Sequence, residues 1–329
     1  MSGMKASTIK RLLKDRIDDW LKTVDDENVL KLIKQDVLVS GGCIASAFAG
    51  DKINDYDYYF RTRETALAVA HYYVKKFNAL NPPSSREGVQ YEPHIREMEV
   101  VNCKGVSENR IIIYMKSAGV AGEEQEEYQY YEMRGEADQA AFFESLSSEK
   151  IASAVSEDPM EAGEELVHVV RAKEKYRPIF LSENAITLSD KVQLVVRFYG
   201  EAAELHENYD YAHAMCWFDY AKYELHAPAE ALEAILTKTL IYKGSLYPIA
   251  SIFRLRKFIA RGWRITAGQL LKIIFQISKL NLEDRHILRE QLIGVDQAYM
   301  TQLLSAISEN KSQRIDSVYI AKLIDEIFE

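Results

Sequence analysis

The stretch from Leu38 to Phe60, LVSGGCIASAFAGDKINDYDYYF, constrains the fold of this chain more than any other part of the sequence. It opens with a short apolar run that ends in two glycines, which predicts a buried strand entering a tight turn. The small apolar residues CIASAFAG then predict a short helix packed closely on a sheet. NDYDYYF alternates acidic and aromatic residues with the two-residue period of a strand. The stretch therefore predicts a strand–turn–helix–strand unit.

Two aspartates lie on the second strand of this unit. Asp55 and Asp57 are two residues apart, so both carboxylates project from the same face. Two like charges this close repel each other unless a cation lies between them, and hard oxygen ligands suit Mg²⁺ or Mn²⁺. At the turn, Gly41 and Gly42 let backbone N–H groups approach phosphate oxygens with no side chain in the way. The pattern predicts a triphosphate-binding turn beside a metal site; the alternative is a solvated strand face after an ordinary glycine turn.

A glycine pair, a spacer of this length and an acid pair with hydrophobic neighbours resemble the signature of the DNA polymerase β-like nucleotidyltransferase superfamily. The order and spacing of these parts on one strand–helix–strand unit carry the resemblance, because each part alone is common. The resemblance implies an α+β fold with a polymerase β-like catalytic domain, built as a mixed sheet with flanking helices, and a C-terminal helical domain. It implies an enzyme that moves a nucleoside monophosphate from a nucleoside triphosphate such as ATP to an acceptor hydroxyl, with pyrophosphate release and Mg²⁺ or Mn²⁺ as cofactor.

The superfamily normally supplies a third acid from another strand, and Asp210 is the expected candidate here. It stands at the start of YDYAHAMCWF, which alternates like a strand and follows the apolar run VQLVVRF. By resemblance, Asp210 and the two paired aspartates are catalytic and hold two divalent ions, and Asp210 also takes the acceptor's proton. Asp219 and the pair Glu97 and Glu99 are the other candidates. The alternative for Asp210 is a residue that caps a helix-to-strand junction.

A second resemblance lies in YPIASIFRLRKFIARGWRI. Related proteins of tailed phages and large DNA viruses have a helix with an RLxKYxxRG-like pattern, and its basic positions here are Arg254, Lys257 and Arg261. On a helix these residues recur at intervals of three and four, which makes one basic stripe. By resemblance, Lys257 contacts the triphosphate, and Arg254 or Arg261 assists it. The alternative is a surface stripe that pairs with acids.

The residue after the glycine pair departs from the family pattern. Many members have Ser or Thr there, whose hydroxyl reaches a phosphate, whereas this chain has Cys43, and a thiol is a weaker donor. Ser40 or Ser46 is a possible substitute, and the backbone alone is another. The predicted nucleotide-binding residues are Ser40, Gly41, Gly42, Cys43, Arg254, Lys257 and Arg261.

The rest of the chain offers coarser signals. Residues 8–34 and 64–77 are expected to be helical, and RIIIYMKS and YQYYEM to be strands. PIFLSENAITLSDKVQLVVRF predicts a hairpin of two strands, and AAELHEN a short helix. Everything after Pro228 is expected to be α-helical, including AGQLLKIIFQISKL and SVYIAKLIDEIF.

The domain organisation follows from these elements and from the charge. A nucleotidyltransferase domain is predicted over residues 1–227, with an insertion at about 82–170, and a helical domain over 228–329. Residues 123–165 hold fourteen acidic and two basic side chains, whereas residues 234–282 hold nine basic ones and no acid. The basic stretch suits a polyanion or a triphosphate, and its alternative is a solvated helix surface.

The sequence leaves three functions open. An enzyme acting on a nucleic-acid 3′ end, such as that of RNA or tRNA, is favoured by the basic stretch. An enzyme modifying a protein or a small molecule, or joining nucleotides, is favoured by the net charge of −9 and by the absence of an evident RNA-binding module in the sequence. A nucleotide- or nucleic-acid-binding protein without catalysis is favoured by Cys43.

Cysteine content and hydropathy predict a cytoplasmic protein, in the host cytoplasm if a phage encodes it. The three cysteines form no CxxC pair or disulfide framework, and no apolar run approaches the roughly 18 residues that cross a membrane. No membrane partner is therefore expected. The sequence also lacks zinc-ligand spacing, a P-loop and a nucleophile elbow.

Overall fold

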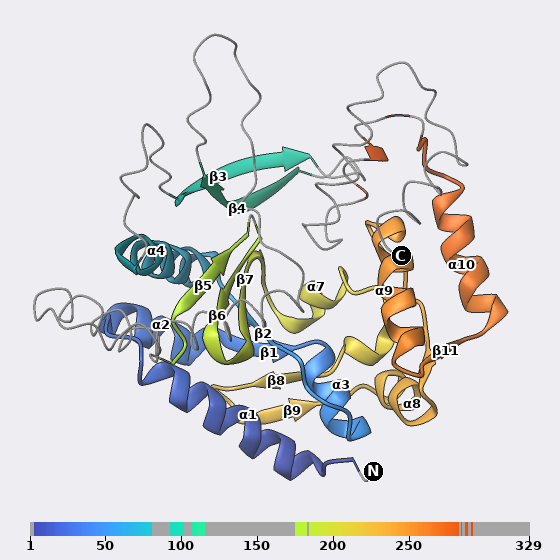
Figure 1. Ribbon diagram of the computed structural model, residues 1–329, viewed down its shortest axis with the longest axis horizontal. Coiled ribbons are helices and arrows are strands. Elements are labelled where there is room, and N and C mark those ends of the chain that lie inside the picture. The colour runs from blue at the N-terminus through green and yellow to red at the C-terminus, as the bar shows by residue number, and fades with distance from the viewer. Residues whose placement is uncertain are drawn as a thin grey trace, which may run out of the picture.

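The computed structural model (Figure 1) describes residues 3–80, 93–101, 107–115, 175–182, 184–282, 284, 287, 288 and 291. These residues form an α+β structure, in which helices pack against a seven-stranded mixed sheet and two small two-stranded sheets accompany it. The predicted fold class, a mixed sheet with flanking helices, is confirmed at this level. None of the described helices is long and apolar enough to cross a membrane.

The predicted strand–turn–helix–strand unit lies in the middle of the large sheet. β1 (Val37–Ser40) leads through Gly41 into α3 (Gly42–Ala49), and β2 (Tyr56–Phe60) returns antiparallel to β1. The other strands of this sheet are β5 (Pro178–Leu181), β6 (Ala185–Leu188), β7 (Val192–Tyr199), β8 (Trp217–Asp219) and β9 (Glu224–His226). The order is β5-β6-β7-β2-β1-β8-β9; β2 and β7 run parallel, and the other neighbours run antiparallel.

One face of the large sheet carries the main core. The helices on it, besides α3, include α1 (Ala6–Leu21) and α4 (Arg63–Leu80), with α2 (Glu27–Asp36) packed on α4. Alternate strand residues such as Val39, Tyr58 and Leu194 pack into this core. Trp20 of α1 is fully buried there, and its indole N–H donates to the Tyr73 hydroxyl of α4 at 2.7 Å. Burial of such large side chains is the dominant stabilising term in a core of this kind.

The opposite face carries the predicted site. Leu38 and Tyr59 on that face pack against α7 (Ala202–His206) in a second, smaller cluster. Ser40 and Asp57 stand two residues from Leu38 and Tyr59 on their strands, so they share this face. The sheet therefore buries one face in the main core and presents Asp57 from the other.

The region after residue 227 is mostly helical. Its described helices are α8 (Ala229–Thr237), α9 (Pro248–Ala260) and α10 (Ala267–Ile277). Two-residue strands β10 (Thr239–Leu240) and β11 (Arg264–Ile265) pair in parallel between these helices, so the prediction of a purely helical region was wrong at this point. Ile235, Leu255 and Trp263 belong to the same core cluster as the sheet, and this core runs across the predicted boundary after residue 227.

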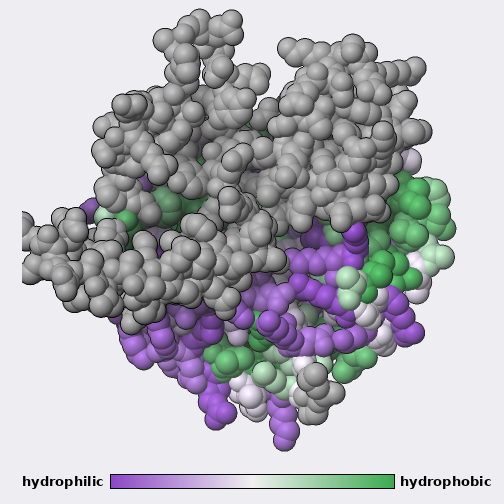
Figure 2. Space-filling view, in the orientation of Figure 1, coloured by the Kyte–Doolittle hydropathy of each residue, from purple (hydrophilic) through white to green (hydrophobic). Residues whose placement is uncertain are grey.

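The last described helix, α10, presents apolar residues to solvent. Leu270, Leu271, Ile274 and Phe275 are exposed, whereas Ile273 is buried in the main core. Figure 2 shows hydrophobic surface gathered over α10 at the right edge of the view. Exposed apolar surface of this kind is typical of interaction sites.

Two stretches fold differently from their prediction. Helix 8–34 is interrupted, because the Asp26 side chain accepts hydrogen bonds from the N–H groups of Asn28 and Val29 and caps α2 as a new helix. The predicted two-stranded hairpin is a three-stranded meander, β5–β6–β7. The Ser182 N–H donates to the Ala185 carbonyl at 2.8 Å between β5 and β6, and Ser189–Lys191 form a 3₁₀ turn between β6 and β7, so the chain turns twice where the sequence predicts one turn.

The predicted strand YDYAHAMCWF is also different. Tyr211 makes one isolated bridge with Tyr242, Ala212–Ala214 form a 3₁₀ turn, and β8 begins at Trp217. Alternation of large and small residues fits a strand, but it fits this turn as well. Asp210 therefore precedes a loop and does not start a strand of the sheet.

The predicted insertion at 82–170 is described in part. β3 (Pro93–Val101) and β4 (Ser107–Met115) form an antiparallel hairpin beside α4 and β7, which confirms the strand predicted at RIIIYMKS. The Tyr199 hydroxyl of β7 donates to the Asn109 carbonyl of β4 at 2.8 Å. The predicted strand YQYYEM, the acidic stretch 123–165 and the predicted helix SVYIAKLIDEIF lie outside the described residues.

Candidate active site

The turn between β1 and α3 requires glycine at position 41. Gly41 has φ 98° and ψ −157°, a conformation that is strained for any residue with a side chain. A Cβ atom at Gly41 would lie 3.0 Å from Oδ2 of Asp57. The Gly41 N–H donates to the carbonyl of Ala214 at 3.2 Å, which fixes the turn against the 3₁₀ segment. The missing side chain is thus what lets the turn approach Asp57.

Gly42 begins α3 and faces open space. A Cβ atom at Gly42 would meet no atom within 4 Å, and no side chain caps the N-terminus of the helix. The first N–H groups of a helix lack intrahelical partners and carry a partial positive charge. A phosphate group is the ligand that such a terminus suits best.

Asp55 and Asp57 lie together beside this turn. Asp57 is half-buried and in register with Ser40, whereas Asp55 is exposed immediately before β2. Within the described residues, no hydrogen bond or ion pair engages either carboxylate. Burial, followed by the charge of Asp55, raises the pKa of Asp57 to about 8. A cation bound beside Asp57 would offset both the burial of its negative charge and the repulsion from Asp55. The pair therefore fits a divalent metal ion with oxygen ligands.

Of the predicted basic stripe, the structure brings Lys257 to the pair. Its charge acts on Asp57 and opposes the rise in the pKa of that carboxyl. Arg254, one turn earlier on α9, contacts Asp210, and Arg261 is exposed just past the end of α9. The helix thus places one of its three predicted cations at the site.

Asp210 is not brought to Asp55 and Asp57 in a shared metal site. Its carboxylate is mostly buried and lies 2.7 Å from Nε of Arg254. Its backbone carbonyl accepts a hydrogen bond from the N–H of Lys243, which ties the loop down. The described residues contain no cluster of three or more His, Cys, Asp and Glu side chains placed to hold a metal ion.

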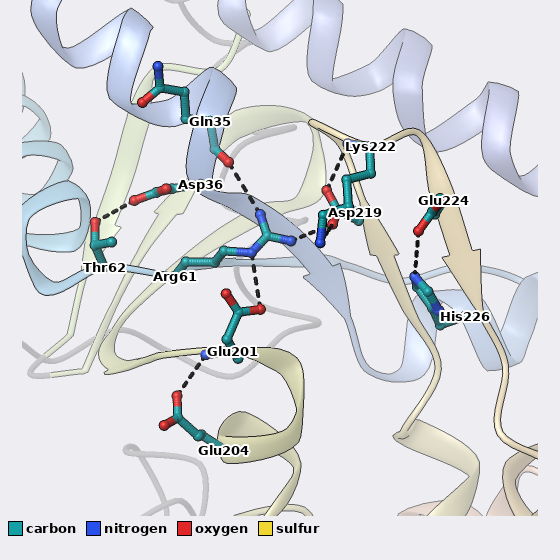
Figure 3. A network of polar contacts seen from close by, with 10 residues as sticks. All are labelled: Gln35, Asp36, Arg61, Thr62, Glu201, Glu204, Asp219, Lys222, Glu224 and His226. Atoms are coloured by element: carbon teal, nitrogen blue, oxygen red, sulfur yellow. Dashed lines mark hydrogen bonds and ion pairs between the residues drawn. The ribbon is translucent and has the colours of Figure 1, made fainter.

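The other candidate acids are engaged elsewhere. Asp219 is buried on β8 and paired with Arg61 and Lys222, in the polar network of Figure 3. Glu97 and Glu99 lie on β3 in a separate two-stranded sheet, where an arginine and a serine, respectively, contact them. Neither alternative adds a carboxylate to the Asp55 and Asp57 pair.

Ser40 and Cys43, both predicted to bind nucleotide, direct their side chains into the protein. The Ser40 hydroxyl donates to the carbonyl of Cys216 at 3.1 Å and lies 2.9 Å from Nε2 of His206. The Cys43 thiol belongs to the main core, and its burial raises its pKa well above the ordinary range. Neither of these two described side chains faces a phosphate at this turn, so the turn offers its backbone N–H groups.

Sequence reasoning missed two residues beside the site. The Tyr209 hydroxyl is buried 3.9 Å from the position of a Cβ atom on Gly41, and burial raises its pKa. Gln193 on β7 is the parallel-strand neighbour of Asp57. Neither residue stands near Asp55 or Asp57 in the sequence, so only the strand order and the loop after α7 bring them there.

The basic stretch 234–282 is partly neutralised within the protein. Lys238 pairs with Asp51 at 3.0 Å, and Lys243 with Glu230 at 2.6 Å. Both pairs are partly exposed, so each adds little stability. They show that part of this stretch pairs with acids of the same chain, which neither the predicted polyanion surface nor its alternative, a solvated helix surface, included.

Comparison with known proteins gives one match. The sequence profile of a family described as "Gad2: Gabija anti-defense 2 family protein" matches residues 11–238, from α1 to the end of α8. The curated proteins and the solved structures contain no match. A family of anti-defense proteins agrees with the phage origin that the sequence resemblance implies. Because the match covers more than half of the 329 residues, the chain belongs to the Gabija anti-defense 2 family.

Proposed function

We propose that this protein is a metal-dependent nucleotidyltransferase, which moves a nucleoside monophosphate from a nucleoside triphosphate to an acceptor hydroxyl. One observation carries the proposal: Gly41, the residue immediately before α3, approaches the carboxylate of Asp57 so closely that a Cβ atom there would lie 3.0 Å from Oδ2. A metal-bound triphosphate needs adjacent sites for an anion and a cation. The N-terminus of α3 suits the phosphates, and the carboxylate of Asp57 suits the metal ion.

The reaction forms a bond between the acceptor oxygen and the α-phosphorus. The bond from that phosphorus to the oxygen bridging the β-phosphate breaks, pyrophosphate leaves with the bonding electrons, and the hydroxyl proton passes to solvent. Mg²⁺ or Mn²⁺ held by Asp55 and Asp57 supplies charge neutralisation and Lewis acidity. The backbone N–H groups of Gly42 and Cys43 bind phosphate oxygens, and Lys257 neutralises charge that develops on them.

The acceptor is proposed to be a component of the Gabija defence system, because the family description names that system. A protein or small-molecule acceptor is favoured over an RNA or tRNA 3′ end. The reason is that ion pairs within the chain occupy part of the basic stretch, as at Lys238 and Lys243.

Label transfer tests the proposal. The protein is incubated with each α-³²P-labelled nucleoside triphosphate, Mg²⁺ or Mn²⁺, and Gabija components or a host extract separated into RNA, protein and small molecules. Label is expected in one fraction, to be lost in Asp57→Asn and retained in Asp51→Asn. Asp51 is a matched control, since it lies past the other end of α3 in an exposed ion pair.

A nucleotide-binding protein without catalysis is the second candidate. It is favoured by the described residues offering two carboxylates, and no third, at the site. Binding of a labelled triphosphate that needs Gly42 and Lys257, with no label transferred to any fraction, is the result that would select it.

A further inference from the structure

We propose that the Gln193 side-chain amide provides the third protein oxygen of the Asp55 and Asp57 site, and that the divalent cation consequently enters together with the nucleotide. The inference rests on the proposed function and deepens it.

The strand register places Gln193 at the site. β2 and β7 pair in parallel with Asp57 opposite Gln193, and Ser40 stands opposite Asp57 on the other side. Residues in register across a sheet point to the same face, and neighbouring strands lie about 4.8 Å apart. Tyr56, Tyr58 and their counterparts on β7 point into the main core, which confirms that Asp57 and Gln193 share the opposite face.

The amide of Gln193 is available for a ligand. Its side chain is half-buried, and no hydrogen bond within the described residues engages it. A half-buried amide normally finds a partner, since leaving its polar atoms unsatisfied is costly. Its carbonyl oxygen is a ligand type that Mg²⁺, Mn²⁺ and Ca²⁺ accept.

No described carboxylate competes for this position. Asp210 is paired with Arg254, and Asp219 with Arg61 and Lys222. The strand next to β2 on the other side supplies Ser40, whose hydroxyl is bonded to His206 and to a backbone carbonyl.

The charge balance then determines when the cation binds. Two carboxylates and a neutral amide face the metal, while Lys257 and the N-terminus of α3 add positive potential at the same place. The positive charge of Lys257 and the N-terminus of α3 therefore weaken the binding of a free divalent cation at this site. A polyanionic triphosphate on α3 cancels that repulsion and brings oxygen ligands of its own.

Manganese binding measures this directly and needs no turnover. Free Mn²⁺ is quantified from its electron paramagnetic resonance signal with the protein alone, with an α,β-methylene nucleoside triphosphate alone and with both, because the analogue itself chelates Mn²⁺ and only the retention beyond that of the analogue alone counts. Wild type is expected to retain Mn²⁺ at least tenfold more tightly with the analogue than without it. Gln193→Glu is expected to raise the affinity for free Mn²⁺ at least tenfold, and Gln35→Glu, an exposed change of the same charge, to leave it unaltered.

Three outcomes would overturn the inference. Tight Mn²⁺ binding by the wild type without nucleotide contradicts the coupled entry. If Gln193→Glu leaves the affinity for free Mn²⁺ unchanged while Asp57→Asn abolishes Mn²⁺ retention with the analogue, Gln193 is not a metal ligand and the proposed function still stands. If wild type retains no Mn²⁺ under either condition, both proposals fall. Should Gln193→Glu not fold, Gln193→Asn replaces it. This shorter amide is expected to weaken retention with the analogue severalfold, and unchanged retention counts against Gln193.

Discussion

Oδ2 of Asp210 lies 2.7 Å from Nε of Arg254, so the charges of these two side chains neutralise each other. Asp210 had been expected to bind metal and Arg254 to assist with the triphosphate. The pair joins the loop after α7 to α9, the helix that also carries Lys257. The pair ties α9 to that loop.

Breaking this pair is expected to affect stability first. Asp210→Asn leaves Arg254 without its carboxylate and should lower the free energy of unfolding by about 1.5–3 kcal/mol, the usual range for a hydrogen bond to a charged group. Urea unfolding of Asp210→Asn, Arg254→Gln and the double variant measures their coupling. A variant Asp210→Asn with wild-type stability and no transfer activity would instead make Asp210 catalytic.

The two glycines of the turn are expected to respond differently. Gly41→Ala meets Asp57 and an unfavourable φ, so it should cost about 1–3 kcal/mol of stability. The added methyl group of Gly42→Ala meets no atom of the protein and should leave stability nearly unchanged. It should raise the KM for the nucleotide, because it stands where the phosphate is proposed to bind. Thermal unfolding and nucleotide KM, measured on both variants, separate these effects. An unchanged KM in Gly42→Ala would show that no phosphate lies there.

The basic stripe on α9 offers a matched pair of substitutions. Lys257→Met removes the cation whose charge reaches Asp57, and kcat/KM is expected to fall about 10²–10³-fold. Arg261→Met, past the end of the same helix, is expected to stay within about twofold of wild type. Steady-state kinetics of the two variants measure this difference. Equal falls in kcat/KM would contradict the placement of Lys257 at the site.

Metal affinity is expected to rise with pH. The pKa of Asp57 is raised to about 8 in the metal-free protein, so near pH 6.5 its carboxyl is mostly protonated and must lose a proton to bind a cation. Mn²⁺ affinity with nucleotide analogue present should therefore increase from pH 6 to about 8 and then level off. Titration over that range measures it, and an affinity independent of pH would contradict the environment assigned to Asp57.

Stability is expected to fall in acid because of His213. This side chain is 2% exposed between Phe258 and Trp263, and its burial lowers its pKa from 6.5 to about 4. The unfolded chain therefore binds the proton first, and stability is lost as the pH falls from 6.5 towards 4. The contribution is about 3 kcal/mol, since one pKa unit corresponds to about 1.4 kcal/mol. Urea unfolding at pH 7 and pH 4.5 should show a smaller difference for His213→Leu than for wild type.

The central unit could be predicted from sequence because its signals are local. The apolar run, the glycines and the alternation around Asp57 each act within a few residues, and β1, α3 and β2 appear where these signals stand. The helix that carries Lys257 was predicted from the resemblance of its Arg254–Gly262 segment to a helix of related proteins, and it appears as α9.

The surroundings of the unit depend on contacts between distant segments. Gln193 faces Asp57 because β7 pairs with β2 across more than a hundred residues, and nothing in VQLVVRF indicates its neighbour. Likewise, YDYAHAMCWF has the period of a strand, yet Tyr211 bridges to Tyr242 and turns Asp210 towards Arg254. Local alternation cannot decide between a strand and such a turn, because tertiary pairing makes that choice.

Pyrophosphate release tests the central claim most directly. Wild type, Asp57→Asn and the control Asp51→Asn are compared with all four nucleoside triphosphates, with Mn²⁺ or Mg²⁺ and with Gabija components present. The account predicts release by wild type and by Asp51→Asn, with at least a hundredfold loss in Asp57→Asn. Equal release by Asp57→Asn, or none by any of the three while the labelled triphosphate binds, would contradict it.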